Sequence, residues 1–396
     1  GWPGFAWSQK GRTRGPAGSI SATGSFYARR SWCGTGIVFQ PRKESTHVST
    51  VLLTGGAGYI GTVLTEELLA AGHKVICLDR VFFGMDVLAD FLDHPNYTLV
   101  RDDVRRFDKS VMRGVDAVVA LAAISNDPAC DLDPEITRGI NLEGTLRAAR
   151  LAKEMGVGRF IFSSSCSVYG QGVDKRLSEN SPLAPVSLYA RCKVEAEARL
   201  LDMNSDDFAV TVLRNATVYG PSRRMRYDLV LNLMTVKAFN ERVIYVLGGG
   251  QQWRPNLHVR DCARAVGLVL DQAVEKVAGR IFNVGANEQN FQVLDIAHIV
   301  RDVMPDVTIK VVPDDPDKRD YNVNFDRIAQ ELGFRAEHTL SEAVLEIKSR
   351  LTKGTIWSYN EPRTRTLEYY SWLLKAQRIL NDVCLGGRLF DIETPP

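Results

Sequence analysis

The strongest constraint on the fold is a glycine-rich turn between an apolar strand and an amphipathic helix. The segment TVLLTGGAGYIGTVLTEELLAAGHKVICLDR, residues 50–80, has the pattern of a strand–helix–strand unit. It predicts a strand over 51–53, a helix over about 58–71 and a second strand over 75–78. Glycines at 55, 58 and 61 let the backbone approach a pyrophosphate, whose charge the helix N-terminus favours. The unit therefore predicts dinucleotide binding.

The residue that ends the second strand indicates which dinucleotide is bound. Asp79 lies 18 residues after Gly61. A carboxylate here accepts hydrogen bonds from the adenosine ribose hydroxyls and repels a 2′-phosphate, which favours NAD over NADP. Arg80 makes the choice between NAD and NADP less sharp; the alternative for Arg80 is a solvent-facing side chain stacked beside the adenine.

Further strands and helices alternate downstream of this unit. Strands are predicted over 97–101, 117–121, 160–163 and 209–213, and helices over 134–155 and 187–203. This alternation predicts an α/β fold with a doubly wound parallel sheet.

Composition excludes several other classes of protein. The longest apolar runs, such as 117–124, fall well short of the ~20 residues that a membrane-spanning helix needs, so we expect no membrane segment. Seven scattered cysteines without a CxxC pair indicate reduced thiols, and six dispersed histidines predict no metal site. The net charge is +2, but residues 1–43 carry seven basic residues and no acid, which leaves −5 for the rest. This mildly acidic body argues against a nucleic-acid partner.

Residues 1–48 are rich in Gly, Ser, Thr and Arg and have no periodic pattern, which predicts a disordered basic tail. Its composition is typical of an organelle transit peptide, and it fits a cloning remnant or an upstream translated segment equally well. We expect a cytoplasmic protein, or an imported one if the tail is a transit peptide.

A second constellation combines hydroxyls at a strand end with a tyrosine and a lysine on the next helix. SSSCSVYG, residues 163–170, ends a predicted strand, where side chains of an α/β sheet face the ligand crevice. Tyr189 and Lys193 are four residues apart and share one helix face. Because an ammonium favours a neighbouring phenolate, we expect Lys193 to lower the pKa of Tyr189 and make it a usable base.

Ten motifs follow one another between about residues 50 and 345. They are TGGAGYIG (54–61), LDR (78–80), DDV (102–104), LAA (121–123), NLEGT (141–145), SSSCSVYG (163–170), YARCK (189–193), LRNATVYGP (213–221), RPNLHVRD (254–261) and NVG (283–285). In this order the chain resembles the extended short-chain dehydrogenase/reductases, specifically the NAD-dependent nucleotide-sugar epimerase/dehydratase family, similar to UDP-glucose 4-epimerase.

The resemblance implies a doubly wound parallel Rossmann sheet with a smaller C-terminal α/β substrate lobe. The NAD-binding domain would span 49–222, with 254–284 returning to it, and the substrate lobe would span 223–345. The residues implied to bind NAD are Gly55, Gly58, Tyr59, Ile60, Gly61, Asp79, Arg80, Asp103, Val104, Leu121, Ala122, Ala123, Asn141, Tyr189 and Lys193.

The resemblance also implies catalytic and substrate-binding roles. The catalytic hydroxyl of the family lies five residues before the glycine of VYG, which is Ser165 here. Tyr189 would take a proton from a sugar hydroxyl, and Lys193 would hold the nicotinamide ribose. The residues implied to bind a nucleoside-diphosphate sugar are Ser125, Thr217, Arg254 and Arg319. Thr217 stands where many relatives have Asn. For each of the two arginines, the alternative is a surface side chain without a ligand.

The two residues after Ser165 distinguish between reactions. Relatives that eliminate water carry Asp-Glu there, and relatives that epimerise at C3 and C5 carry a cysteine two residues after the hydroxyl. This chain has Cys166 and Ser167, so Cys166 is expected to be a packed side chain. The remaining chemistry is that of a 4-epimerase, which oxidises the sugar at C4 and returns the hydride to the opposite face of the sugar. A 4-keto-sugar reductase and a non-catalytic NAD-binding regulatory relative are the alternatives.

Residues 346–396 extend beyond the usual end of the family. RTLEYYSWLLKAQRIL, residues 365–380, has apolar residues at helical spacing. It predicts a helix packed on the substrate lobe or on a partner subunit, since the resemblance makes a homodimer possible.

Overall fold

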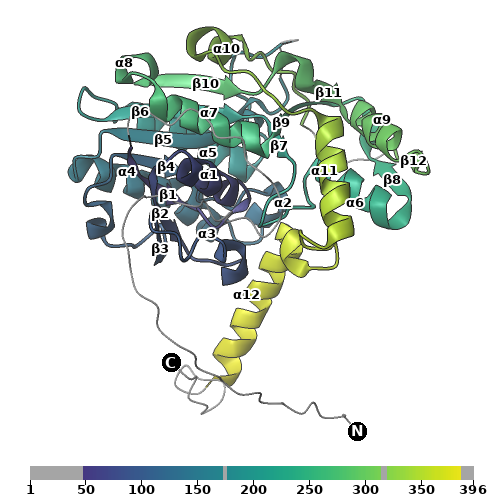
Figure 1. Ribbon diagram of the computed structural model, residues 1–396, viewed down its shortest axis with the longest axis horizontal. Coiled ribbons are helices and arrows are strands. Elements are labelled where there is room, and N and C mark those ends of the chain that lie inside the picture. Colours follow the sequence, from purple (N-terminus) through teal and green to yellow (C-terminus); the bar gives the residue numbers. More distant parts are fainter. Residues whose placement is uncertain (1–47, 173–175, 314–318, 385–396) are drawn as a thin grey trace, which may run out of the picture. The chain divides into compact units, whose positions relative to one another are not determined.

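The computed structural model describes residues 48–172, 176–313 and 319–384 (Figure 1). The predicted basic tail lies, up to residue 47, outside the described residues. In the part of the chain that is described, no helix is both long and apolar enough to cross a membrane.

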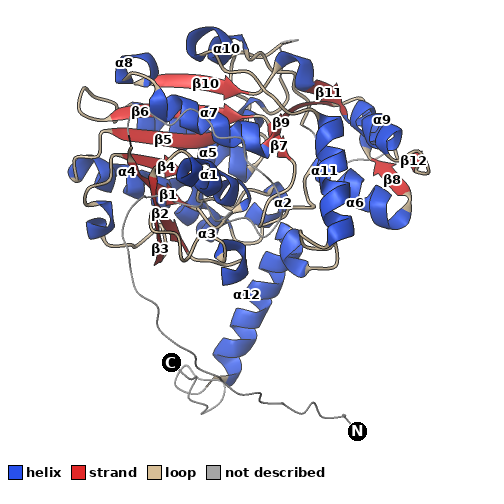
Figure 2. Cartoon of the chain, in the orientation of Figure 1, coloured by secondary structure: helices blue, strands red, loops and turns tan. Residues whose placement is uncertain are grey.

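The core of the chain is a sheet of seven parallel strands in the order β10-β6-β5-β4-β1-β2-β3 (Figure 2). The strands are β1 (Thr50–Thr54), β2 (Lys74–Asp79), β3 (Tyr97–Arg101), β4 (Ala117–Ala120), β5 (Arg159–Ser165), β6 (Ala209–Asn215) and β10 (Arg280–Val284). The order reverses between β1 and β4, and ligands of such sheets bind at this reversal, outside the carboxyl ends of the strands. The predicted doubly wound Rossmann sheet is confirmed.

Helices cover both faces of this sheet, because its strands are apolar on both sides. On one face, α1 (Tyr59–Ala70) packs beside α7 (Val259–Asp271), and both contribute to one buried cluster. On the other face, α4 (Thr145–Glu154) and α5 (Leu188–Leu201) contribute to a second cluster. The shorter α-helices of the described chain are α2 (Asp127–Cys130), α3 (Pro134–Arg138), α8 (Val274–Val277) and α10 (Asp326–Leu332).

The helix predicted over 134–155 is interrupted. The chain forms α3, then a π-helical turn over Gly139–Gly144, then α4. Asn141 lies in the π-turn and is fully buried, and its side chain bonds both the backbone N–H and the C=O of Ile124. The wider turn thus places an amide against the loop after β4, as π-turns often do near functional sites.

The second part of the chain is smaller and mixes short strands with helices. Its core lies between α6 (Val230–Glu241), α9 (Val293–Val303) and α11 (Leu340–Lys353). The strands are β7 (Thr217–Tyr219), β9 (Trp253–His258) and β11 (Asn290–Gln292) in one sheet, and β8 (Val243–Val246) and β12 (Thr308–Val311) in another. In the sequence β10 lies between β9 and β11, but it joins the large sheet beside β6.

The C-terminal helix α12 (Thr366–Val383) contacts the predicted substrate lobe at its first residue, through Arg224 and Thr366, and otherwise packs on the Rossmann part; packing on a partner subunit stays a prediction. The segment before it does pack on the second part of the chain, since Tyr227 bonds the backbone oxygens of Trp357 and Thr364. The helix itself contacts α2 and the loop after β2, both in the Rossmann part (Figure 1). Aromatic residues of that loop, Phe82 and Phe83, provide the apolar surface on which it packs.

Candidate active site

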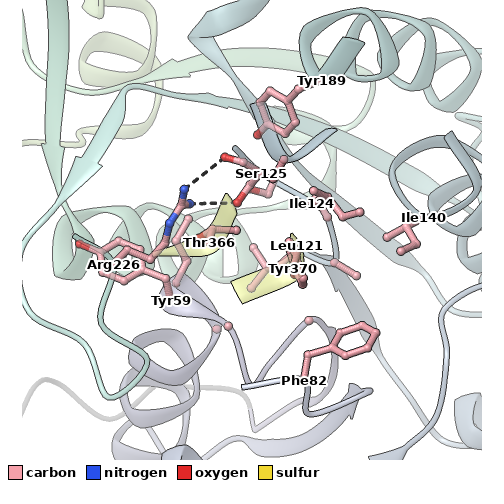
Figure 3. A pocket seen from close by; sticks show the side chains of 18 of the residues that line it. Tyr59, Phe82, Leu121, Ile124, Ser125, Ile140, Tyr189, Arg226, Thr366 and Tyr370 are labelled. Atoms are coloured by element: carbon pink, nitrogen blue, oxygen red, sulfur yellow. Dashed lines mark hydrogen bonds between the residues drawn. The ribbon is translucent and has the colours of Figure 1, made fainter. Parts of the chain in front are cut away.

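A cavity of about 540 Å³ opens at the reversal point of the large sheet. This volume lies in the range of small-molecule sites, roughly 300–1,000 Å³. Of the twenty residues predicted for the site, only Asn141 and Arg254 do not line the cavity. The eighteen that line it are Gly55, Gly58, Tyr59, Ile60, Gly61, Asp79, Arg80, Asp103, Val104, Leu121, Ala122, Ala123, Ser125, Ser165, Tyr189, Lys193, Thr217 and Arg319. Figure 3 shows Tyr59, Leu121, Ser125 and Tyr189 around it.

The glycine turn leaves no room for side chains. Gly55 has φ +79°, and a Cβ there would lie 2.7 Å from the backbone nitrogen of Ala122. A Cβ on Gly61 would lie 2.4 Å from the backbone oxygen of Gly55. The N-cap of α1 is Gly58, which has no side chain to cap the first N–H groups of the helix. The first turn of α1 lines the cavity, so these uncapped groups provide a site for an anion, and the turn fits a dinucleotide pyrophosphate.

Asp79 is held firmly at the end of β2. Its carboxylate accepts hydrogen bonds from the backbone N–H groups of Ala57 (3.0 Å) and Val81 (2.6 Å). Burial raises the pKa of Asp79, while these two bonds and the charge of Arg224 oppose the rise. The carboxylate is thus fixed in orientation on the cavity wall, as a ribose-binding acid requires.

Arg80 is engaged with protein groups at the edge of the cavity. It donates to Asp103 at 2.9 Å, and its guanidinium lies 4.8 Å from the ring centre of Phe82. Arg105 donates to the same carboxylate at 2.7 Å and lowers the pKa of Asp103 well below its usual range. Two cations therefore share one acid here, and Arg80 is placed between Asp103 and an aromatic ring.

The three predicted catalytic residues come together from β5 and α5. Ser165 is the last residue of β5, and its hydroxyl hydrogen-bonds Tyr189. The Lys193 ammonium lies 5.6 Å from the centre of the Tyr189 ring and donates to the backbone oxygen of Ser163 at 2.6 Å. Ser187 caps α5 through the N–H of Ala190, which fixes the helix that carries both residues.

The expected effect of Lys193 on Tyr189 is wrong for the chain by itself. Burial raises the pKa of Tyr189, Asp127 raises it further, and Arg226 and the bond to Ser165 only partly oppose this. Burial also lowers the pKa of Lys193 to about 8. Spacing placed the two side chains on one face, but both lie in a poorly solvated wall, where burial is the largest influence on each pKa.

The other residues of SSSCSVYG serve the structure beneath the site. Ser164 bonds Glu197, which forms an ion pair with Arg214 at 2.7 Å, and both partners are only 3% exposed. Cys166 is buried, which raises the pKa of its thiol, and its Sγ contacts the backbone oxygen of Arg214 at 3.2 Å. Cys166 is therefore a packed side chain, as its sequence position suggested.

The two arginines predicted for the substrate have different places. Arg319 lines the cavity and pairs with Asp127 at 2.8 Å. Arg254 lies behind it and donates to the backbone oxygen of Arg319 at 2.5 Å. In this structure Arg254 positions the segment that carries Arg319, and its contact with a diphosphate stays a prediction.

Several cavity residues lie outside the sequence-based set. Arg226 donates to the Ser125 hydroxyl at 2.9 Å (Figure 3). It also pairs with Asp228 at 2.8 Å. Arg224, in the same run PSRRMRYD, also lines the cavity. The sequence contained a signal for Arg224 and Arg226, because three arginines directly follow a recognised motif. Other wall residues belong to α12: Thr366, Tyr370, Leu373, Leu374 and Gln377.

A Rossmann sheet, a glycine cradle for a pyrophosphate and a Ser-Tyr-Lys set beside it define a dinucleotide-dependent enzyme of the short-chain dehydrogenase/reductase class. Residues 51–285 match the model of the NAD dependent epimerase/dehydratase family. The chain belongs to this family.

Three relatives illustrate the range of its activities. The chain is 30% identical over 267 residues to an uncharacterized UDP-glucose epimerase, YtcB, of Bacillus subtilis, which covers 64% of this chain and 81% of the relative. It is 28% identical to UDP-glucuronic acid decarboxylase 1 of Arabidopsis thaliana, over 74% of this chain and 68% of the relative. The structure of the dTDP-glucose 4,6-dehydratase DesIV from Streptomyces venezuelae, solved with NAD bound, matches with TM-score 0.68 and 27% identity, over 79% of this chain and 99% of that one.

Proposed function

We propose that the protein is an NAD-dependent nucleoside-diphosphate-sugar 4-epimerase. One observation carries this proposal: Ser165, Tyr189 and Lys193 meet on the cavity wall, while the next two positions hold a buried thiol and a serine. The set supports proton and hydride transfer at one carbon, and it lacks the adjacent carboxylates that elimination of water requires.

Each residue has a separate task in this reaction. Tyr189 takes the proton of the sugar 4-hydroxyl and later returns a proton to the same oxygen. Ser165 hydrogen-bonds that oxygen and so holds it beside the phenol. Lys193 supplies a positive charge near the ring, and Asp79 with the glycine turn holds the dinucleotide. When bound, NAD accepts a hydride from C4 and returns it.

The buried phenol has a consequence for this scheme. A free tyrosine is already protonated at neutral pH, and burial, which raises the pKa of Tyr189, makes its deprotonation harder still in the chain alone. A positive charge that enters the cavity beside the phenol lowers this pKa. We therefore infer that Tyr189 becomes an effective base only in the loaded enzyme, which limits unproductive proton transfer in the free protein.

Neighbouring activities of the family are alternatives with different products. A 4-keto-sugar reductase would use the same residues but consume reduced cofactor. A dehydratase or a decarboxylase would need further acid, base or carboxylate-binding groups. Asp127 lines the cavity near Tyr189, but its carboxylate is paired with Arg319. A non-catalytic NAD-binding regulator would not need the Ser-Tyr-Lys arrangement.

A panel of nucleotide sugars analysed by NMR tests the proposal. We expect inversion at C4, no net change in NADH absorbance and no loss of carbon dioxide or water. Tyr189→Phe is the matched control, since it removes only the phenolic oxygen. A product with a 4-keto-6-deoxy sugar, a pentose, or one equivalent of oxidised cofactor per turnover would refute the epimerase.

A further inference from the structure

The C-terminal helix α12 forms one wall of the cavity. Its cavity-lining residues are Thr366, Tyr370, Leu373, Leu374 and Gln377. Apart from the adjacent Leu373 and Leu374, they recur at intervals of three or four residues, so they form one continuous face of the helix. The glycine turn and the loop from Leu121 to Ser125 line other parts of the same cavity. Figure 3 shows Thr366 and Tyr370 at the cavity.

We propose that α12 covers the bound dinucleotide and keeps it in the enzyme between turnovers. This inference rests on the proposed function, because a 4-epimerase returns the hydride to the same sugar and needs no exchange of cofactor. It assigns a binding role to residues beyond the segment that matches the family, which ends at residue 285.

The start of α12 is anchored to the loop that follows Asp79. Tyr369 donates to the backbone oxygen of Phe82 at 2.8 Å, and Arg363 donates to that of Phe83 at 2.8 Å. The ring of Tyr370 meets Phe82 edge to face, with the ring centres 6.1 Å apart. These contacts tie the helix to the loop that directly follows the predicted ribose-binding carboxylate of Asp79.

A buried arginine connects the helix to the cavity floor. Arg224 is 2% exposed and donates to the Thr366 hydroxyl at 3.1 Å, while its guanidinium lies 3.7 Å from the ring centre of Phe83. Within the described chain its Nε has no hydrogen-bond partner. The positive charge of Arg224 also opposes the rise in the pKa of Asp79, so a cation lies near the predicted ribose site. An anionic ligand in the cavity is thus held by a residue that the helix itself helps to fix.

The geometry has a kinetic consequence for the ligand. Leu373 and Leu374 present apolar surface to the cavity, whereas Lys375, the next residue, is exposed to solvent. Release of a dinucleotide past this wall requires the helix contacts to separate. Removing one large apolar side chain from such a wall is expected to speed release about tenfold or more.

The test compares Leu374→Ser and Tyr370→Ala with Lys375→Ser in the full chain. Lys375→Ser is the matched control, because it places the same side chain on the outer face of the helix. The measurements are NAD content per purified chain and the exchange rate of labelled NAD, made without any sugar. Unfolding temperature at saturating NAD verifies that each variant is folded.

We expect near-stoichiometric NAD with slow exchange in the wild type and in Lys375→Ser, and at least tenfold faster exchange in the two cavity-facing variants. Equal exchange rates in all four proteins, or equal acceleration by Lys375→Ser, would overturn the role of α12. The readout is independent of the reaction. If no sugar is epimerised yet the variants exchange NAD faster, the 4-epimerase fails while the covering helix stands.

Discussion

Lys193 is predicted to destabilise the cofactor-free protein while it serves the reaction. Its side chain is 2% exposed, and burial lowers its pKa from 10.5 to about 8. A pKa difference of one unit corresponds to about 1.36 kcal/mol, so at pH 7 the buried ammonium destabilises the fold by about 3 kcal/mol relative to water. The bond to the backbone oxygen of Ser163 is worth about 1 kcal/mol net, and its loss in Lys193→Met offsets part of the gain.

The sign of the pH dependence follows from the direction of the shift. Because the folded pKa lies below the unfolded one, the unfolded chain binds more protons between about pH 8 and 10.5, and stability rises with pH in this window. The penalty from Lys193 falls from about 3 kcal/mol at pH 7 to about 2 at pH 9 and about 1 at pH 10. The Lys193→Met variant has no buried ammonium and therefore no such penalty, so the wild type gains stability relative to the variant as pH rises.

The assay is urea unfolding of NAD-stripped protein at pH 7, 9 and 10, since bound NAD would stabilise only the native state. We expect Lys193→Met to be at least as stable as the wild type at pH 7, and we expect its stability relative to the wild type to fall by about 2 kcal/mol between pH 7 and pH 10, which leaves the two proteins nearly equal at pH 10. Lys353→Met, at an exposed lysine, is the control that should show no such slope. A difference between wild type and Lys193→Met that stays constant with pH would refute the buried-charge reasoning.

Three further predictions concern the site and its support. Tyr189→Phe should lower turnover about 100-fold or more without lowering NAD content, measured by NMR and by acid extraction. Glu197→Ala leaves Arg214 buried without its partner and should lower the free energy of unfolding by about 3–5 kcal/mol; a loss below about 1 kcal/mol would contradict this. Burial lowers the pKa of His258, so its contribution to stability is present above about pH 6.5 and declines at lower pH; His258→Gln should remove this part of the acid sensitivity in thermal unfolding.

The sheet and the glycine turn could be predicted because their signals are local. An apolar strand, a Cβ-free turn and an acid at the next strand end lie within residues 50–80, and β1, α1 and β2 form close to the predicted positions. The π-turn at Gly139–Gly144 could not be predicted in this way. It depends on a bond between Asn141 and Ile124, which periodicity in either segment does not reveal.

Spacing predicted which side chains meet, but not how well they are solvated. Tyr189 and Lys193 lie on one face as expected, yet the predicted fall in the pKa of Tyr189 is wrong, because desolvation is a property of the whole cavity wall. The same limit applies to Arg254 and Arg319. Both were expected near a diphosphate, and only the packed structure shows that one lies behind the other.

The helix α12 could be predicted from the sequence, but the surface on which it packs could not. Its apolar spacing predicted a helix with one buried face, which is a local property, but the surface that buries this face lies nearly 300 residues earlier, at Phe82 and Phe83. Several apolar surfaces compete for such a helix, and the choice depends on partners such as Arg224 and Arg363, whose bonds exist only after both parts have folded. The same contacts turn an appendage into a wall of the cofactor cavity. A change in the extension therefore acts on cofactor exchange, although no recognised motif of the family lies within it.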